Sequence, residues 1–101
     1  MRTRIRVEAQ VEEFVKSLAP DPRRRLRLAI RGLADGRGDI KSLEGNLAGF
    51  CRLGVTGYRV IYNERVERGV RIIDCLFGER RALVHEIFLK LLVEQTVESP
   101  R

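Results

Sequence analysis

The sequence has little of several residue types that often carry chemistry: no tryptophan, one histidine and two cysteines among 101 residues. Cys51 and Cys75 stand in apolar stretches, so we expect reduced, buried thiols rather than a disulfide, and no Cys/His spacing suggests zinc. No apolar run approaches the roughly 18–20 residues of a membrane span, and no signal-peptide core follows the basic N-terminus. These absences predict a cytoplasmic protein without a metal, a cofactor or a membrane partner.

Negative charge is also scarce, with 14 acidic against 20 basic residues and a formal net charge of +6. All but three of the basic residues are arginine, the side chain that binds phosphate with two parallel hydrogen bonds. A polyanion such as nucleic acid, or an acidic protein segment, would suit this charge. A genome rich in arginine codons would produce the same bias, so the charge alone does not identify a partner.

The first half of the chain reads as a strand and two helices. Alternation predicts a strand over residues 1–7, with its arginines on the outer face. Apolar residues at helical spacing predict a helix over residues 7–18. A second helix begins at Asp21-Pro22, where aspartate caps and proline fits the first turn, and ends at Gly36. The short link favours an antiparallel helical hairpin.

The second half reads as loop, sheet and helix. Residues 36–49 are rich in glycine and polar groups and predict a loop. Three strands follow, at residues 50–55, 58–63 and 70–77. We expect a turn over residues 63–69 and a break at Gly78. Apolar spacing predicts a C-terminal helix over residues 83–92.

Together these elements predict an α+β domain with an N-terminal strand, an antiparallel helical hairpin, a three-to-four-stranded antiparallel sheet and a C-terminal helix. We expect the helices to cover one face of the sheet. Residues 1–95 form one domain, and residues 96–101 form a frayed tail.

Three groups of polar residues are candidates for function. Arg52 and Arg59 stand on half-buried strands, which would hold a guanidinium rigidly against a phosphate. Arg59 could instead pair with Asp74 on the neighbouring strand. Arg23, Arg24 and Arg27 crowd the second helix, as a solvated face or as a surface for RNA. His85, the sole histidine, titrates near neutral pH, although a surface histidine on an amphipathic helix is the simpler interpretation.

The chain resembles the RelE/ParE superfamily of bacterial toxins over roughly residues 1–93. The resemblance lies in the element order and in three segments: Leu43-x-Gly45 with Gly49-Phe50, then Gly57-Tyr58-Arg59-Val60-Ile61-Tyr62, then Phe77-Gly78-x-Arg80 with Val84-His85 and Phe88. It implies the RelE-like fold and a toxin of a type II toxin–antitoxin pair. Members of the RelE branch cleave mRNA on the ribosome without metal, whereas the ParE branch acts on DNA gyrase. Both are neutralised by a cognate antitoxin.

The resemblance also assigns roles to individual residues. Arg59 matches the phosphate-stabilising arginine, Arg52 a basic position on the preceding strand, and Arg80 or Arg81 the basic position before the last helix. His85 falls where relatives carry a tyrosine. The implied catalytic set is Arg52, Arg59, Arg81 and His85. The implied RNA-binding set is Arg80, Arg23, Arg24 and Arg27.

Two departures from the family pattern bear on activity. Gly54 stands where a second basic residue is usual, and the lysine that can serve as base is missing, since Lys16, Lys41 and Lys90 fall elsewhere. Arginine is too weak an acid to replace that base at neutral pH. We therefore expect His85 to carry the proton transfer, or the nuclease activity to be weak or lost. The alternatives are a ParE-like, non-enzymatic gyrase toxin and a non-toxic basic binding module.

Overall fold

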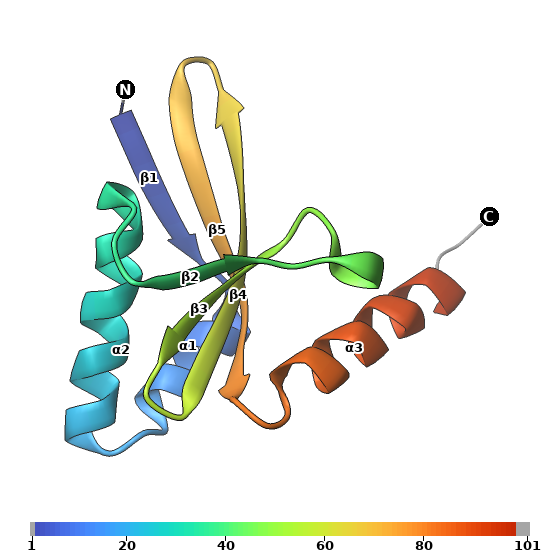
Figure 1. Ribbon diagram of the computed structural model, residues 1–101, viewed down its shortest axis with the longest axis horizontal. Helices are drawn as coiled ribbons and strands as arrows, with labels where there is room; N and C mark the ends of the chain where they lie inside the picture. Colours follow the sequence, from blue (N-terminus) through green and yellow to red (C-terminus); the bar gives the residue numbers. More distant parts are fainter. Residues whose placement is uncertain (1, 99–101) are drawn as a thin grey trace.

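The computed structural model describes residues 2–98 as one five-stranded sheet with helices on both faces (Figure 1). The elements run in the order β1 (Arg2–Val7), α1 (Ala9–Lys16), α2 (Pro20–Gly32), η1 (Leu33–Asp35), β2 (Asp39–Ser42), η2 (Gly45–Leu47), β3 (Cys51–Val55), β4 (Tyr58–Glu67), β5 (Val70–Arg80) and α3 (Val84–Glu98). The strand order is β1-β5-β4-β3-β2, with β1 parallel to β5 and the other neighbours antiparallel. The predicted α+β fold is confirmed, with a wider sheet than the sequence indicated.

The main core lies between the sheet and the helical hairpin. Both helices present an apolar stripe, Val11 and Val15 from α1 and Leu26 and Ile30 from α2. They pack on alternate residues of the central strands, which face the same side because successive strand residues point to opposite faces. The buried strand residues of this core are Leu53, Val60, Tyr62, Ile73 and Cys75. Burial of these side chains supplies most of the driving force for folding.

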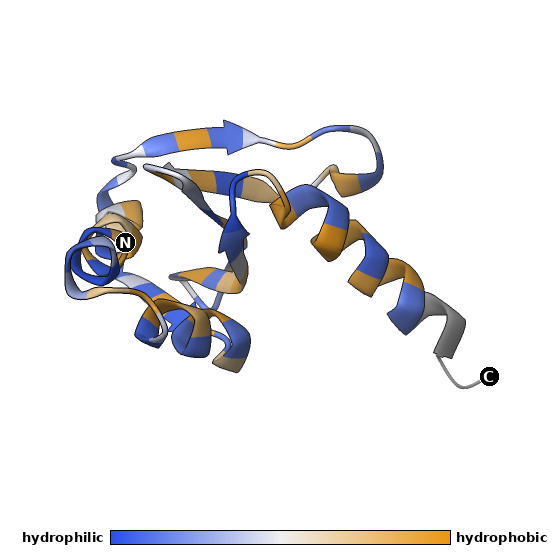
Figure 2. Ribbon diagram, turned by 90° about the horizontal axis from the view of Figure 1, so that it is seen from below, coloured by the Kyte–Doolittle hydropathy of each residue, from blue (hydrophilic) through white to orange (hydrophobic). Residues whose placement is uncertain are grey.

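A second, smaller core lies on the opposite face, under α3. Val84 and Phe88 of α3 pack on Ile61 and Phe77, and Leu47 of η2 closes the cluster. A register shift beside Ile61 and Tyr62 brings Ile61 opposite Phe77 on this side of the sheet. The expectation that all helices cover one face is therefore wrong, because the residues that alternate with the main core are apolar here. Figure 2 shows α3 on the far side of the molecule from α1 and α2.

The strands are longer than the sequence predicted. β4 and β5 pair continuously from Tyr58 with Arg80 to Glu67 with Val70, so the predicted turn over residues 63–69 is wrong. The chain reverses only at Arg68 and Gly69, both of which have positive φ angles of 51° and 77°. The predicted break at Gly78 is also wrong, because Gly78 pairs with Val60 inside the ladder. Its missing side chain leaves room for Phe14, since a Cβ there would lie 3.1 Å from the ring.

Three further boundaries differ. The predicted loop over residues 36–49 contains the edge strand β2 and the 3₁₀ turn η2. The first helix begins at Ala9, because Val7 still belongs to β1. α3 continues through residues 96–98, where the sequence predicted a frayed tail, and residues 99–101 of that tail lie outside the described residues.

Both cysteines are free, as expected. Cys75 lies in the main core, where desolvation of the thiolate raises the pKa of its thiol to about 12. No helix in the described part of the chain is both long enough and apolar enough to cross a membrane.

Candidate functional site: a cationic cluster beside the start of α3

Strand pairing brings polar residues from four strands into two adjacent rows on the face that α3 covers in part. One row contains Asp39, Gly54, Arg59 and Glu79, which are register partners across β2, β3, β4 and β5. The next row contains Lys41, Arg52, Ile61 and Phe77 in the same strand order. Directly paired residues share a face of the sheet. Arg52, Arg59 and Lys41 therefore lie side by side, and we call these residues with His85 the cationic cluster.

Arg59 is held rigidly inside this arrangement. Its residue is only 9% exposed, and its Nη1 donates a hydrogen bond of 2.8 Å to the carbonyl oxygen of Tyr58. Burial lowers the pKa of Arg59 from its ordinary value, and the nearby charges of Arg52 and Arg81 lower it further. An arginine keeps its proton at neutral pH even so. The guanidinium is therefore a fixed positive charge with little freedom to move.

Gly54 makes this position of Arg59 possible. A Cβ at residue 54 would lie 3.1 Å from the guanidinium carbon of Arg59 and 2.6 Å from the carboxylate of Asp39. Any side chain there would force one of these groups to move. The glycine that replaces a basic residue of the family pattern thus provides the space over β3 in which the guanidinium lies.

Arg52 and Lys41 come from neighbouring strands and face one another in register. The side chain of Arg52 is 16% exposed, and its Nη1 lies 3.5 Å from the carboxylate of the exposed Asp39. Lys41 stands on β2, in the segment that the sequence predicted as loop, so its place in the cluster was missed. The alternation of Asp39, Ile40 and Lys41 was the available signal.

His85 is the second residue of α3 and is exposed. Val84 before it is fully buried in the second core, which anchors the start of the helix against Ile61 and Phe77. The pKa of His85 is lowered by desolvation and by the charges of Arg52, Arg59 and Lys41. The imidazole is therefore uncharged at neutral pH and able to accept a proton. Lys41 is therefore one of the sources of this shift.

The two arginines between β5 and α3 differ in position. Arg80 pairs with Tyr58, whose neighbours Val60 and Tyr62 point into the main core, so Arg80 points to the helical-hairpin face. Arg81 follows it on the turn, donates its backbone N–H to the carbonyl of Gly57, and lies close enough to lower the pKa of Arg59. Of the two, Arg81 is thus the one near the cluster.

The arginines of the second helix lie apart from the cluster, on the hairpin side of the sheet. Arg24 pairs with Asp21 at 3.0 Å, Arg27 lies 3.6 Å from Glu12, and Arg23 is half-buried on α2. Their predicted role in RNA binding stays a prediction. The suggested pair between Arg59 and Asp74 is wrong, because Asp74 binds Arg65 and Arg6 at the other end of the sheet.

Several solved structures have a fold similar to that of this chain. The archaeal RelE of a RelE–RelB complex from Pyrococcus horikoshii is 27% identical, with 80% of this chain and 97% of that chain covered and a TM-score of 0.59. A chain of a RelB–RelE complex from Methanococcus jannaschii is 18% identical. That match covers 82% of this chain and 98% of that chain, with a TM-score of 0.58. A YoeB/ParE toxin from Agrobacterium tumefaciens is 15% identical. That match covers 80% of this chain and 99% of that chain, with a TM-score of 0.56. By sequence, no protein-family model and no curated protein matches the chain.

These matches define the fold. The chain has the fold of the RelE and YoeB/ParE toxin structures, as its sequence resemblance implied. Within that fold, the cationic cluster combines fixed guanidinium groups, a flexible ammonium group and a neutral imidazole. These groups can hold a phosphate and accept a proton beside it.

Proposed function

We propose that this chain is the toxin of a type II toxin–antitoxin pair and acts as a metal-independent, ribosome-associated mRNA endonuclease that inhibits translation. The observation that carries the proposal is the meeting of Arg52, Arg59 and Lys41 with a neutral His85 on one face of the sheet. Lys41 and His85 are exposed on this face, where a single-stranded RNA could bind.

The chemistry would be an attack of the ribose 2′-oxygen on the adjacent phosphorus. The new bond forms as the bond to the 5′-oxygen breaks, which leaves a cyclic phosphate on one fragment and a 5′-hydroxyl on the other. His85 accepts the 2′-hydroxyl proton, while Arg52 and Arg59 stabilise the extra negative charge on the phosphate. The exposed Lys41 can donate a proton to the departing oxygen, and the exposed Arg81 can donate hydrogen bonds to it.

The position of Lys41 changes what we expect of the nuclease activity. The sequence indicated a site without the lysine base, in which either His85 carries the proton transfer or the nuclease function is weak or lost. With Lys41 opposite Arg52, the cluster contains an ammonium group beside the imidazole. The balance therefore favours an active nuclease over a ParE-like, non-enzymatic toxin.

A cognate antitoxin is the second part of the proposal. The archaeal RelE that is 27% identical to this chain was solved in complex with RelB. The formal net charge of +6 would attract an acidic partner and speed its association. We expect a gene for a small acidic protein beside the gene for this chain.

The test is a reconstituted translation reaction in which mRNA breaks are mapped by primer extension. We expect cuts that require ribosomes and that disappear with Arg59→Ala. His85→Gln should slow them, whereas Lys90→Ala on the exposed part of α3 should not. Unchanged cutting in both site variants would overturn the assignment. Inhibition of gyrase supercoiling without mRNA cutting would instead support the ParE-like alternative.

A further inference from the structure

A carboxylate lies in the space over Gly54, among the arginines of the cationic cluster. Asp39 is the register partner of Gly54 on the edge strand β2. A Cβ at residue 54 would lie 2.6 Å from Oδ2 of Asp39 and 3.1 Å from Nη1 of Arg59. The same Oδ2 atom lies 3.5 Å from Nη1 of Arg52. One carboxylate oxygen and two guanidinium groups therefore border the same small space over a glycine.

The carboxylate is held weakly in this place. The side chain of Asp39 is 62% exposed, and it accepts no hydrogen bond from the described residues. An ion pair with so exposed a partner contributes little free energy, because water screens the charge. The side chain can therefore turn away from the cluster while the backbone of β2 stays paired with β3.

A phosphate that binds the cluster needs the same space. Arg52 and Arg59 border it, and guanidinium groups bind phosphate oxygens in the way that they bind carboxylate oxygens. Two anions in one small site repel each other. The charge of Asp39 already acts on the buried guanidinium, since it raises the pKa of Arg59 against the effects of burial and of the other arginines. The carboxylate is therefore placed to compete with a phosphate for these arginines.

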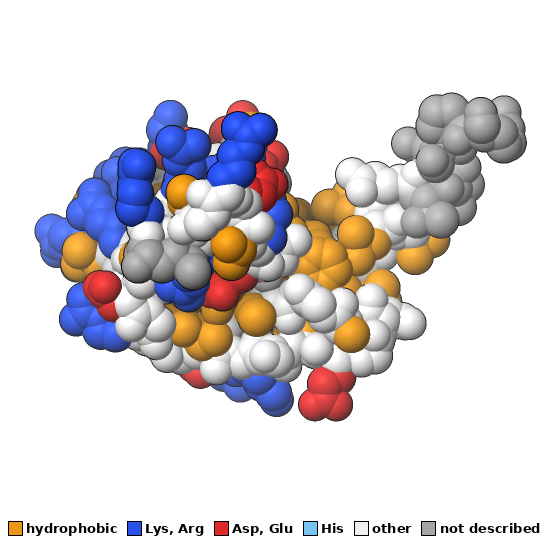
Figure 3. Space-filling model, turned by 90° about the horizontal axis from the view of Figure 1, so that it is seen from above, with side chains coloured by type: hydrophobic (Ala, Val, Ile, Leu, Met, Phe, Trp, Pro, Cys, Tyr) orange, Lys and Arg blue, Asp and Glu red, His pale blue; other side chains and the backbone are white. Residues whose placement is uncertain are grey.

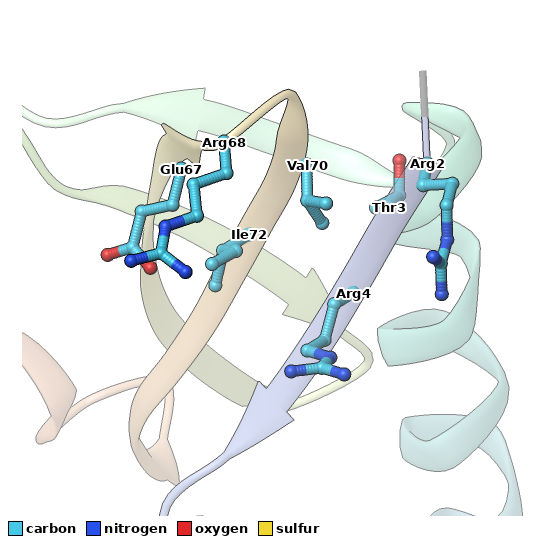
Figure 4. Close-up of a pocket in the computed structure, with 7 residues that line it drawn as sticks. All are labelled: Arg2, Thr3, Arg4, Glu67, Arg68, Val70 and Ile72. Carbon is cyan, nitrogen blue, oxygen red and sulfur yellow. The ribbon is translucent and has the colours of Figure 1, made fainter.

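A second carboxylate stands among arginines at the opposite end of β4. Glu67 lines a hollow there together with Arg2, Arg4 and Arg68 (Figure 4). Figure 3 shows this end of the molecule, where Lys and Arg side chains gather with acidic side chains among them. Glu67 lies 2.6 Å from Nε of Arg65. It is therefore a matched control for Asp39, because it is a carboxylate among arginines that lies away from the cationic cluster.

We propose that Asp39 is an internal competitor for the phosphate site of the cationic cluster. Its carboxylate occupies the site in the free protein and turns out of it when an RNA phosphate binds between Arg52 and Arg59. The inference rests on the proposed function, because it takes the cluster as the site that binds the phosphate. Competition of this kind lowers the affinity for free RNA. It therefore favours mRNA that is presented at high local concentration, as on the ribosome.

The first test measures binding at the cluster itself. The ligand is 2′-O-methyl uridylyl-uridine, a dinucleotide with one phosphodiester and without the 2′-hydroxyl that cleavage needs. Proton NMR at constant pH follows the imidazole of His85, the only histidine of the chain, as the ligand is added. We expect Asp39→Asn to bind about fivefold more tightly than the unaltered protein, the size of effect of one exposed charge pair. Glu67→Gln removes the same charge elsewhere and should stay within about twofold, because salt screens distant charges.

The outcomes of this titration separate the inference from the proposed function. Equal affinities of the unaltered protein and Asp39→Asn would overturn the competitor and leave the cluster as a phosphate site. Equal tightening by Glu67→Gln would also overturn it, because net charge would then explain the gain. If the His85 resonance moves in none of the proteins, the cluster does not bind phosphate, and the proposed function and the inference fail together.

The second test asks whether the negative charge of residue 39 is responsible. Asp39→Ala should bind the dinucleotide as tightly as Asp39→Asn does, because neither variant has a carboxylate. Asp39→Glu keeps the carboxylate and should stay near the affinity of the unaltered protein. Tight binding by Asp39→Glu would overturn the proposal.

The third test distinguishes a competitor from a catalytic group, since a carboxylate beside a phosphate could instead accept the 2′-hydroxyl proton. It follows single-turnover cleavage of ribosome-bound mRNA at increasing toxin concentration. We expect Asp39→Asn to reach half of its maximal rate at a lower concentration, with no fall in the maximal rate. Loss of a general base would instead lower the maximal rate by roughly 10²- to 10⁴-fold. Such a loss would overturn the proposal and place Asp39 in the chemistry.

Discussion

At the end of the sheet that holds Asp74 and Glu64, three arginines (Arg6, Arg65 and Arg71) are paired with carboxylates, whereas at the β2–β3 end the arginines stand together with little opposing charge. Asp74, only 8% exposed, binds Arg65 and lies 3.6 Å from Arg6. Arg71 bonds Glu64 in the same region. Arg59 forms no ion pair among the described residues, and the only carboxylate near Arg52 is the exposed Asp39 at 3.5 Å. The same residue type thus stabilises the fold at one end and stays available at the other.

Burial with little opposite charge is what separates the cationic cluster from the Asp74 region. A buried ion pair costs desolvation free energy that its attraction repays only with good geometry, and losing one partner leaves a buried charge. The buried Arg59 has two other arginines and only the exposed Asp39 near it, so its free energy improves when an anion binds. We therefore expect the cationic cluster to bind a phosphate, whereas the Asp74 pair is complete without one.

The sharpest way to break this comparison is to remove one arginine from each end. Arg59→Ala should lower the rate of mRNA cleavage by roughly 10²- to 10³-fold, the cost of removing one fixed donor from a transition state. Arg65→Ala should leave the rate of cleavage by the folded protein nearly unchanged. Single-turnover cleavage of ribosome-bound mRNA measures both. Equal losses in the two variants would contradict the division of roles.

Stability should show the opposite pattern. Arg65→Ala leaves Asp74 buried with only Arg6 beside it, and we expect the free energy of unfolding to fall by about 3 kcal/mol, at the lower end for a broken buried pair. Arg68→Ala, in the turn of the same hairpin, is the control and should stay within about 0.5 kcal/mol. Urea denaturation followed by circular dichroism measures both values. A loss as large at Arg68 would mean that the hairpin itself, and not the ion pair, is sensitive.

Gly54 tests whether the position of Arg59 matters. Gly54→Ala places a methyl group against the guanidinium of Arg59 and the carboxylate of Asp39, and the shift should reduce cleavage by about tenfold. Gly57→Ala in the adjacent turn is the matched control, since a Cβ there meets nothing within 4 Å. Full activity of the Gly54 variant would show that the guanidinium does not need its present place.

The smallest expected effect is a change in the pKa of His85. Lys41 is one of the cations that lower this pKa, so Lys41→Ala should raise it toward the ordinary value of 6.5. Proton NMR can follow the titration without assignment, because the chain has one histidine. The acid limb of cleavage should move to higher pH in parallel. Lys90→Ala should change neither.

The lowered pKa of His85 also makes the stability of the fold depend on pH. The folded pKa of His85 lies below the unfolded one, so the unfolded chain binds the proton more readily as the pH falls. His85 therefore reduces the free energy of unfolding below about pH 6.5. Lys41→Ala should make this acid loss smaller. An unchanged loss would place Lys41 outside electrostatic reach of the imidazole.

Local patterns predicted much of the fold. The apolar stripes of α1 and α2, the proline-rich link and the Tyr58-Arg59 strand follow from helical and strand periodicity, which neighbouring residues set among themselves. The sequence did not predict β2. Its four residues are exposed and lie between glycine-rich segments, and their alternation of polar and apolar side chains is too weak to indicate a strand. Gly78 was misread because its role is to accommodate Phe14, which is distant in sequence.

The residue types determined that the chain is basic, that it folds as α+β, and that Arg52, Arg59 and His85 are candidates for chemistry. Only the tertiary structure decided which arginines are neutralised, that Lys41 joins the cluster, and that α3 lies opposite the helical hairpin. The reason is that these outcomes depend on strand order and register. Strand order and register are set by packing between segments far apart in the sequence.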